Sequence, residues 1–396
     1  MTAGDPADNP FGGLPMFGDL SRALAGQGPL NWDAAKQFAH LAATGGTAEA
    51  NVDPSVRFAL TALAQIIEPH LLDVTGHELS GYEITTVTPG VWAQQTLEAY
   101  KPLFTQLAVS LGKRPSAADN DGDTDPMAAM MLGLSQMMAP AMLGMAIGSM
   151  VGHLATRAFG QYDLPIPRSA NAQVTVLPSA IDDFAFDWSL PKDSMRIWVL
   201  VQELTSHVVF SVTHIREGLS AMVRAHVGAF EPDPNAVAEK LSSLEFDGDD
   251  PMQAIQRSLG DPEILLGATR SAAQEALQPQ LDAALAAVVG YIDHVVDQIA
   301  FRLIGGDAAR ISEAVRRRRI ETSPDDIFVE RLLGLRLTRQ LVERGRTFIA
   351  GVFERQQQDG VNQLLNRAAP LPTPAELDAP GLWLARLEFP LDDQTS

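Results

Sequence analysis

Cysteine is absent from this chain of 396 residues. Its absence excludes a disulfide framework, a thiolate metal site and a cysteine nucleophile, and it is typical of proteins in a reducing compartment. Basic residues are also scarce, with 29 Lys and Arg against 49 Asp and Glu and a net charge of −20. Non-specific nucleic-acid binding requires a surplus of cations to neutralise phosphate, so we expect no nucleic-acid partner.

Several catalytic fingerprints are missing as well. The sequence contains no P-loop, no dinucleotide-binding fingerprint and no G-x-S-x-G nucleophile elbow. Its first residues include no positively charged segment followed by an apolar core, so we expect no secretory signal and predict a cytoplasmic protein. An apolar content of 46% describes a globular chain that is long enough to bury a large core.

Hydrophobic patterning predicts a mainly α-helical protein with a small β component (α+β). The two expected strands, Glu83–Val87 and Gln173–Leu177, are short and rich in β-branched residues. Most of the remaining chain shows helical periodicity between Pro and Gly signals. We divide the chain into a disordered Gly/Pro-rich leader (1–29), an N-terminal helical region that ends in an acidic loop (30–125), a core (126–390) and a tail (391–396).

The acidic loop contains Asp119–Asp125, with the sequence D-N-D-G-D-T-D. A calcium loop needs Gly at its sixth position and Glu at its twelfth. Here the Gly is out of place and Met130 stands at the twelfth position. We therefore predict a solvated loop and not a calcium site.

Residues 126–152 carry no charged side chain, and the run is long enough to cross a bilayer. A membrane span usually has basic residues at one end and Trp or Tyr at the interfaces, whereas this run follows an acidic loop. We predict a buried helical hairpin that breaks at Ala139-Pro140, with Gly and Ala residues suited to close helix packing. A membrane-associated protein is kept as an alternative.

The most informative stretch is Arg196–Gly218, an apolar helical run with a few polar residues. A zinc metallopeptidase helix carries two His four residues apart, with a Glu beside the first as general base. Here Glu203 stands in the position of the base, but Gln202 and Ser206 occupy the two histidine positions. Because Gln and Ser are poor zinc ligands, the pattern indicates either a degraded zinc motif or a coincidence.

A set of ordered segments resembles one family. The segments are Gly144–Pro165 (ending in G-Q-Y-D-L-P), Val174–Arg216, Val288–Asp297, Glu330–Leu337 (E-R-L-L-G-L-R-L), the run G-R-T-F-I-A-G-V from Gly345, and G-V-N-Q-L-L-N from Gly360. In this order they resemble the actinobacterial zincin-like proteins, which are zinc-dependent metalloproteases or hydrolases. Some of these proteins are associated with deazaflavin-coenzyme biosynthesis. The resemblance implies a zincin-like metallopeptidase fold for residues 126–390, and the low number of Lys relative to Arg suits a high-GC source.

The resemblance also implies where the zinc ligands of active members would fall. Their H-E-x-x-H stretch corresponds to Gln202–Ser206, and an E-G-H-like stretch that could supply the third ligand corresponds to Val289-Gly290-Tyr291. Gln202, Ser206 and Val289 therefore depart from the family's pattern, and only Glu203 matches it as a relic general base. We expect no metal and no cofactor, and a non-catalytic pseudopeptidase that binds a peptide or protein partner.

An active hydrolase with a rewired zinc site is the alternative. The candidate ligands are Glu203, His207, His294 and Asp297, because the first two lie four residues apart on one helix and the others could approach from a later helix. Without a metal, we expect His207 to be hydrogen-bonded at a helix–helix interface and Glu203 to be a buried carboxylate paired with Arg196 or Arg216.

A run of four arginines, Arg316–Arg319, ends a predicted helix that starts near Asp307. Such a run can bind nucleic acid or lipid headgroups. We interpret it instead as a salt-bridged helix end that complements the helix dipole, with partners at Glu321, Asp325 and Asp326.

Overall fold

The computed structural model describes most of the chain. The described residues are 28–79, 81–112, 126–168, 172–230, 271–320, 333–335, 337–366 and 370–388, without the side chains of 126–138 and 320. Residues 1–27 of the predicted leader, the acidic loop at 119–125 and the predicted tail lie outside this set.

The described chain is mainly helical, as predicted. The helices before the second strand are α2 (Trp32–Thr44), α3 (Pro54–Thr75), α4 (Pro89–Ala99), α5 (Lys101–Leu111) and α6 (Pro126–Ala155). The helices after it are α7 (Pro178–Asp187), α8 (Lys192–Ser211), α9 (Thr213–Gly228), α13 (Ala272–Ile304), α14 (Asp307–Ile320), α16 (Arg339–Asn362), the 3₁₀ turn η1 (Gln363–Leu365), α17 (Pro374–Asp378) and α18 (Pro380–Glu388).

Among the described residues, the β component consists of the two predicted strands, β1 (Glu83–Thr86) and β2 (Gln173–Val176). They pair in parallel, with Ile84 opposite Val174. Each strand leads into a helix with Pro in its first turn, α4 after β1 and α7 after β2. The sheet thus joins two chain segments that are about ninety residues apart. It also fixes β2, which is followed in the chain by α7 and α8.

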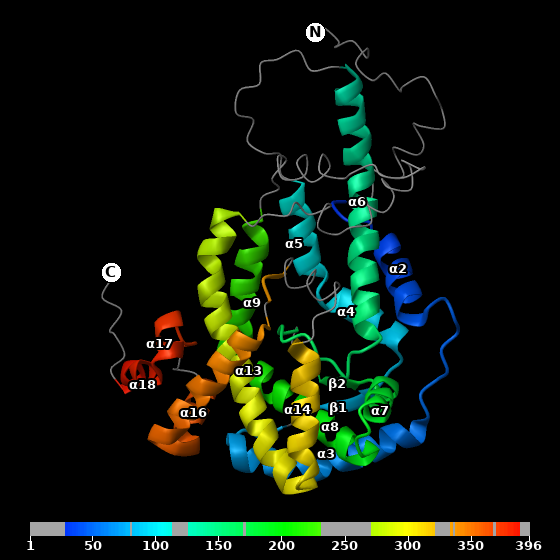
Figure 1. Ribbon diagram of the computed structural model, residues 1–396. Helices are drawn as coiled ribbons and strands as arrows, with labels where there is room; N and C mark the ends of the chain where they lie inside the picture. The colour runs from blue at the N-terminus through cyan, green and yellow to red at the C-terminus, as the bar shows by residue number, and fades with distance from the viewer. Residues whose placement is uncertain are drawn as a thin grey trace.

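The predicted hairpin at 126–152 is wrong, because α6 is one continuous helix with Pro140 inside it. Figure 1 shows α6 rising from the lower body with α2 beside it. Gly144, Gly148 and Gly152 lie one helical turn apart and face α2: a Cβ at Gly148 would lie 2.2 Å from the backbone oxygen of Ala35. The expectation of close packing through small residues therefore holds, but between α6 and α2.

Two other helices extend through prolines that mark boundaries in the sequence. Pro69 lies inside α3 and Pro279 inside α13. Both prolines are on exposed positions, and so are Gln65 and Glu275, whose carbonyl groups lose the helical hydrogen bond. Water can solvate these carbonyls, so the helices continue.

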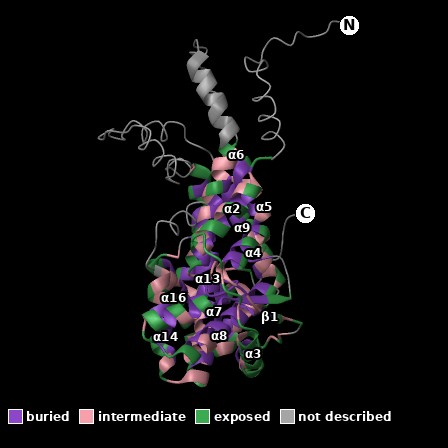
Figure 2. Cartoon of the chain, turned by 90° about the vertical axis from the view of Figure 1, so that its right-hand side faces the viewer, coloured by how far each residue is buried: buried purple, intermediate pink, exposed green. Residues whose placement is uncertain are grey.

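The core forms around α8 and α13. Thirteen of the twenty residues of α8 are buried, and α13 packs against α8, α9 and α16. In Figure 2, the buried residues run through the centre of the lower body and up between the helices above it. The apolar run Arg196–Gly218 is divided between two helices, because Val212 adopts an extended conformation and separates α8 from α9.

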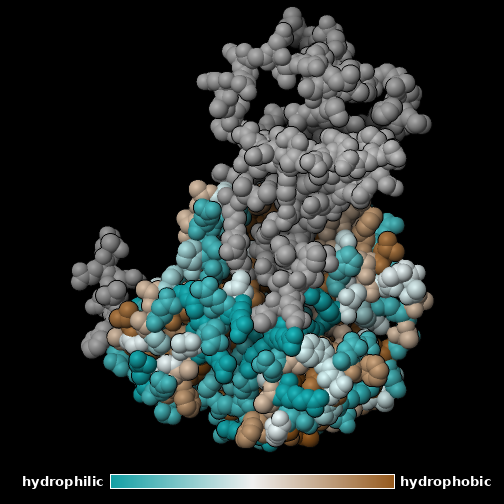
Figure 3. All heavy atoms as spheres, in the orientation of Figure 1, coloured by the Kyte–Doolittle hydropathy of each residue, from teal (hydrophilic) through white to brown (hydrophobic). Residues whose placement is uncertain are grey.

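One helix of the described chain, α13, is long and apolar enough to cross a membrane. Its most apolar window is 72% buried inside the protein, as expected of a core helix. The part of α6 from Ala139 to Ala155 is also apolar but shorter, and the side chains before it are not described. On the face shown in Figure 3, hydrophilic residues gather over α14.

Candidate functional site

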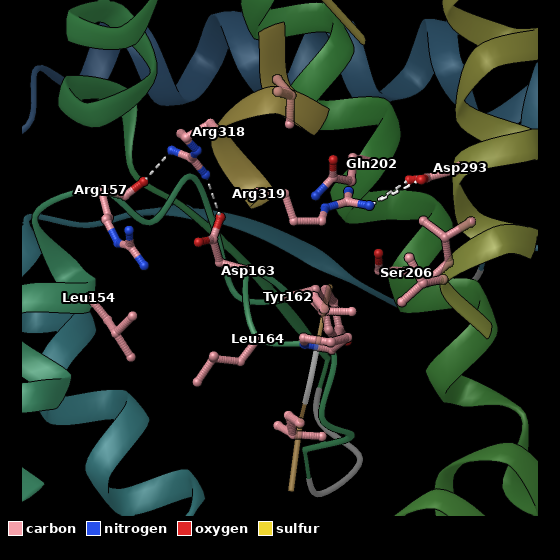
Figure 4. Close-up of a pocket in the computed structure, with 16 residues that line it drawn as sticks. Leu154, Arg157, Tyr162, Asp163, Leu164, Gln202, Ser206, Asp293, Arg318 and Arg319 are labelled. Carbon is pink, nitrogen blue, oxygen red and sulfur yellow. Dashed lines mark hydrogen bonds and ion pairs between the residues drawn. The ribbon is translucent and has the colours of Figure 1, made fainter. Parts of the chain in front are cut away.

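A cavity of about 120 Å³ lies where α8, α13 and α14 meet the segment that follows α6. Its lining includes Gln202 and Ser206 from α8 and Val289 from α13. Figure 4 shows Gln202 and Ser206 on one side, with Asp293 and Arg319 next to them and Asp163 and Arg318 across from them. The structure therefore brings together the three positions at which the sequence resemblance places zinc ligands.

The segment Phe159–Pro165 forms one wall of the cavity and fixes α8 against the sheet. Gly160 forms a bridge to Val176 and accepts a hydrogen bond (2.8 Å) from the indole of Trp92. A Cβ at Gly160 would lie 2.3 Å from Cδ of Glu203, so only glycine allows the segment to pass this close to α8. The tight passage explains why G-Q-Y-D-L-P begins with Gly.

Glu203 lies behind this segment and does not line the cavity. Its side chain is fully buried, its Oε2 accepts a hydrogen bond (3.1 Å) from the Tyr162 amide, and its Oε1 has no hydrogen-bond partner. Burial raises the pKa of Glu203 to about 8; the Tyr162 amide opposes this shift, and so does Arg168. The carboxyl group is therefore mostly protonated at neutral pH and has no contact with the cavity.

The predicted pairing of Glu203 with Arg196 or Arg216 is wrong. Arg196 forms a two-point ion pair with Asp182 (2.8 and 2.7 Å). Arg216 donates to the backbone oxygen of Ser211 (3.1 Å). Glu203 is thus held by a backbone amide and by close packing, and burial favours its neutral form.

His207 makes a hydrogen bond, as expected. Its partner is Tyr162, from the segment Phe159–Pro165. Nδ1 of His207 lies 2.8 Å from Oη of Tyr162, and burial lowers the pKa of the imidazole. Tyr162 also lines the cavity and donates its amide to Glu203. One tyrosine therefore connects the cavity, Glu203 and His207. The sequence analysis missed this role because Tyr162 lies more than forty residues before both Glu203 and His207 in the chain.

The remaining polar wall of the cavity comes from α14 and its partners. Arg319 binds both carboxylate oxygens of Asp293 (3.1 and 3.0 Å). Arg318 donates to the backbone oxygen of Arg157 (2.6 Å) and to Asp163 (3.3 Å), and its guanidinium lies 3.6 Å from the centre of the Phe159 ring. Burial lowers the pKa of Arg318.

The arginine run is therefore salt-bridged, as predicted, but with partners that the sequence analysis did not choose. Arg316 pairs with Asp297, and Arg318 and Arg319 pair with Asp163 and Asp293. The expected partners Glu321, Asp325 and Asp326 lie outside the described residues. The helical spacing of Asp293 and Asp297 with α14 next in sequence is the one signal that could have indicated this pairing.

The structure does not assemble the rewired ligand set. His294 lies 3.1 Å from Oε1 of Gln358 and 2.7 Å from Nε2 of Gln298. Asp297 accepts from Ser312 (2.8 Å) and pairs with Arg316. No group of three His, Asp or Glu side chains able to hold a metal occurs among the described residues. Glu203, His207 and His294 are thus not brought together as a ligand set in the described structure.

The chain was compared with protein families and with known structures. A sequence model of the zincin-like metallopeptidase family matches residues 30–384. The chain belongs to this family. The match includes α2–α5, which precede the region 126–390 in which the sequence resemblance lies.

A comparison with curated proteins found no match. A similar fold occurs in a solved structure from Chloroflexus aurantiacus, described as that of "a putative hydrolase with a novel fold". The two chains are 19% identical with a TM-score of 0.61, and the match covers 91% of this chain and 99% of the other. At this level of identity the likeness concerns the fold.

Zinc, which the zincin-like family implies, does not fit the side chains at the three ligand positions. Gln202 offers an amide oxygen without a hydrogen-bond partner, Ser206 offers a hydroxyl group, and Val289 offers no donor. Zinc requires His, carboxylate or thiolate donors, with one position left for water. The two carboxylates that line the cavity, Asp163 and Asp293, are engaged by Arg318 and Arg319, whose positive charges disfavour a cation.

Proposed function

We propose that this member of the zincin-like family is a pseudopeptidase, which keeps the fold to bind a peptide or protein partner and does not hydrolyse it with zinc. One observation carries the proposal. Gln202, Ser206 and Val289 lie together in a single cavity, and none of them is a good zinc ligand. Good zinc ligands are therefore missing at all three positions of the site and not at one of them alone.

The burial of Glu203 supports the same proposal. A general base must reach the water or hydroxyl group that it deprotonates. Glu203 is separated from the cavity by the segment that contains Gly160 and Tyr162, and the neutral form is favoured. In this arrangement the carboxyl group does not reach a substrate bound in the cavity.

The cavity is suited to part of a partner. Its volume of about 120 Å³ lies below the roughly 300–1,000 Å³ of sites for drug-sized ligands. One side chain or one chain end fits this space. Leucines and Ile292 in the lining provide apolar contact, while Gln202 and Ser206 provide polar groups.

Peptide binding by the full-length chain tests the proposal. A peptide is first selected from a displayed random library on immobilised protein, and its affinity is then measured by fluorescence anisotropy. Val289→Phe fills the cavity and should weaken binding at least about tenfold. Val109→Phe places the same ring at an exposed valine of α5 and should leave the affinity unchanged. Equal binding to both variants, or no peptide above background, would contradict the proposal.

A further inference from the structure

A second pocket, of about 240 Å³, lies between α5, α9 and the segment Ile166–Arg168. It shares no lining residue with the cavity at Gln202. Its polar lining comes from Arg168, Arg216, Ser220 and Arg224, with Glu217 as the one carboxylate among the lining residues. Three arginines against one glutamate is unusual for a chain with a net charge of −20.

Arg168 is the fixed member of this group. Its side chain is only 8% exposed, and its guanidinium lies 5.3 Å from the ring centre of Tyr100 and 5.9 Å from that of Trp92. Nη2 donates to Oγ1 of Thr96 (2.9 Å), while Nε is buried without a hydrogen-bond partner. No carboxylate of the described chain forms an ion pair with Arg168, although a buried cation without a counter-charge is unfavourable.

Arg216, Ser220 and Arg224 are spaced four residues apart on α9, so they lie on one face of the helix. Arg216 donates to the backbone oxygen of Ser211 (3.1 Å). Within the described residues, neither Arg216 nor Arg224 forms an ion pair. Two further, more exposed guanidinium groups therefore line the same pocket as the buried guanidinium of Arg168.

We propose that this pocket binds a small oxyanion, a phosphate or a carboxylate group. The planar guanidinium donates pairs of parallel hydrogen bonds to either group, and a bound anion would provide the counter-charge that Arg168 lacks. The pocket is too small for a drug-sized ligand but has room for an anion with a short organic part. This site is separate from the proposed peptide-binding cavity, and its failure would leave the pseudopeptidase proposal intact.

Calorimetric titration of the full-length protein at low ionic strength tests the proposal, with inorganic phosphate and succinate as the two probes. We expect at least one probe to bind. The double variant Arg216→Gln/Arg224→Gln should weaken this binding about tenfold or more, since hydrogen bonds to charged groups are among the strongest in proteins. Whichever probe binds more tightly identifies phosphate or carboxylate as the source of the charge.

The matched control is Arg57→Gln/Arg346→Gln, which changes the net charge equally at two exposed arginines of α3 and α16. It should alter the affinity less than about twofold, because neither Arg57 nor Arg346 lines the pocket. Arg168→Lys should also weaken binding if it folds; if it does not fold, the α9 double variant still decides. Absence of binding by both probes at millimolar concentration, or equal weakening by the control, would overturn the proposal.

Discussion

At the scale of single residues, Glu203 illustrates how position determines chemistry. The sequence resemblance places it at the position of the family's general base, but its partners come from a segment about forty residues earlier. Tyr162 donates to it and Gly160 packs against it. Such long-range contacts leave no local pattern in the sequence, which is why the sequence-based pairing with Arg196 or Arg216 failed.

The buried carboxyl group predicts a pH-dependent stability. In the unfolded chain the Glu203 side chain loses its proton near pH 4.5, whereas in the folded protein it does so near pH 8. The free energy of unfolding that depends on this group is therefore fully present below about pH 4.5 and falls as the pH rises toward 8, by up to about 1.4 kcal/mol per pH unit. Glu203→Gln should remove this slope, as measured by urea unfolding at several pH values.

Glu354→Gln, at an exposed position of α16, is the control and should retain the slope of the wild-type protein. Parallel curves for the wild-type protein and Glu203→Gln would show that the buried carboxyl group does not take up a proton on folding.

Gly160→Ala tests the contact between the segment and α8. The new Cβ would lie 2.3 Å from Cδ of Glu203, so we expect a loss of about 1–3 kcal/mol in the free energy of unfolding. Glu203→Ala removes the atoms that clash, and the double variant should lose less stability than the sum of the two single changes. Additive losses in denaturant unfolding would show that the two residues do not interact.

At the scale of elements, the sequence predicts a mainly helical chain and both strands, and its error at residues 126–152 follows from a proline. Pro140 is read as the break of a hairpin, yet it lies inside α6, just as Pro69 lies inside α3 and Pro279 inside α13. A proline removes one hydrogen bond and one only, and tertiary packing on the opposite face of the helix retains the rest. The burial that decides this outcome is not visible in the local sequence.

The contact between α6 and α2 gives a prediction with a distinctive sign. Gly148→Ala should raise the intrinsic helix propensity of α6 by about 1 kcal/mol. The methyl group would nevertheless lie 2.2 Å from the backbone oxygen of Ala35, so the helices must separate. We expect net destabilisation of about 1–3 kcal/mol in thermal or urea unfolding. Met145→Ala, at a partly exposed position of the same helix, should have a small effect, and a stabilised Gly148→Ala would refute the close contact.

At the scale of the whole molecule, the fold class and the family follow from sequence, while the site emerges only from assembly. Val289 is separated from Ser206 by more than eighty residues, and the cavity joins them with Arg318 and Arg319. Those arginines are read in sequence as a helix end, since Asp163, the partner of Arg318, lies about 155 residues earlier in the chain. The resemblance to the family indicated which positions correspond to zinc ligands, and the structure shows which residues surround them.

Restoring the ligand types tests whether the cavity retains the family's geometry. In the triple variant Gln202→His/Ser206→His/Val289→Glu, two imidazoles and one carboxylate would face the same cavity. We expect this variant to bind zinc at least about tenfold more tightly than the wild-type protein in competition with a chromophoric chelator. Equal affinity would show that the three positions do not converge as a ligand set.

The zinc content of the wild-type protein tests the central claim most directly. The full-length chain is incubated with zinc, freed of excess metal by gel filtration and measured by atomic emission, with peptide cleavage assayed on the same sample. We predict substoichiometric zinc and no cleavage that depends on Glu203, as judged by comparison with Glu203→Gln. One zinc ion per chain together with cleavage that is lost in Glu203→Gln would contradict the account.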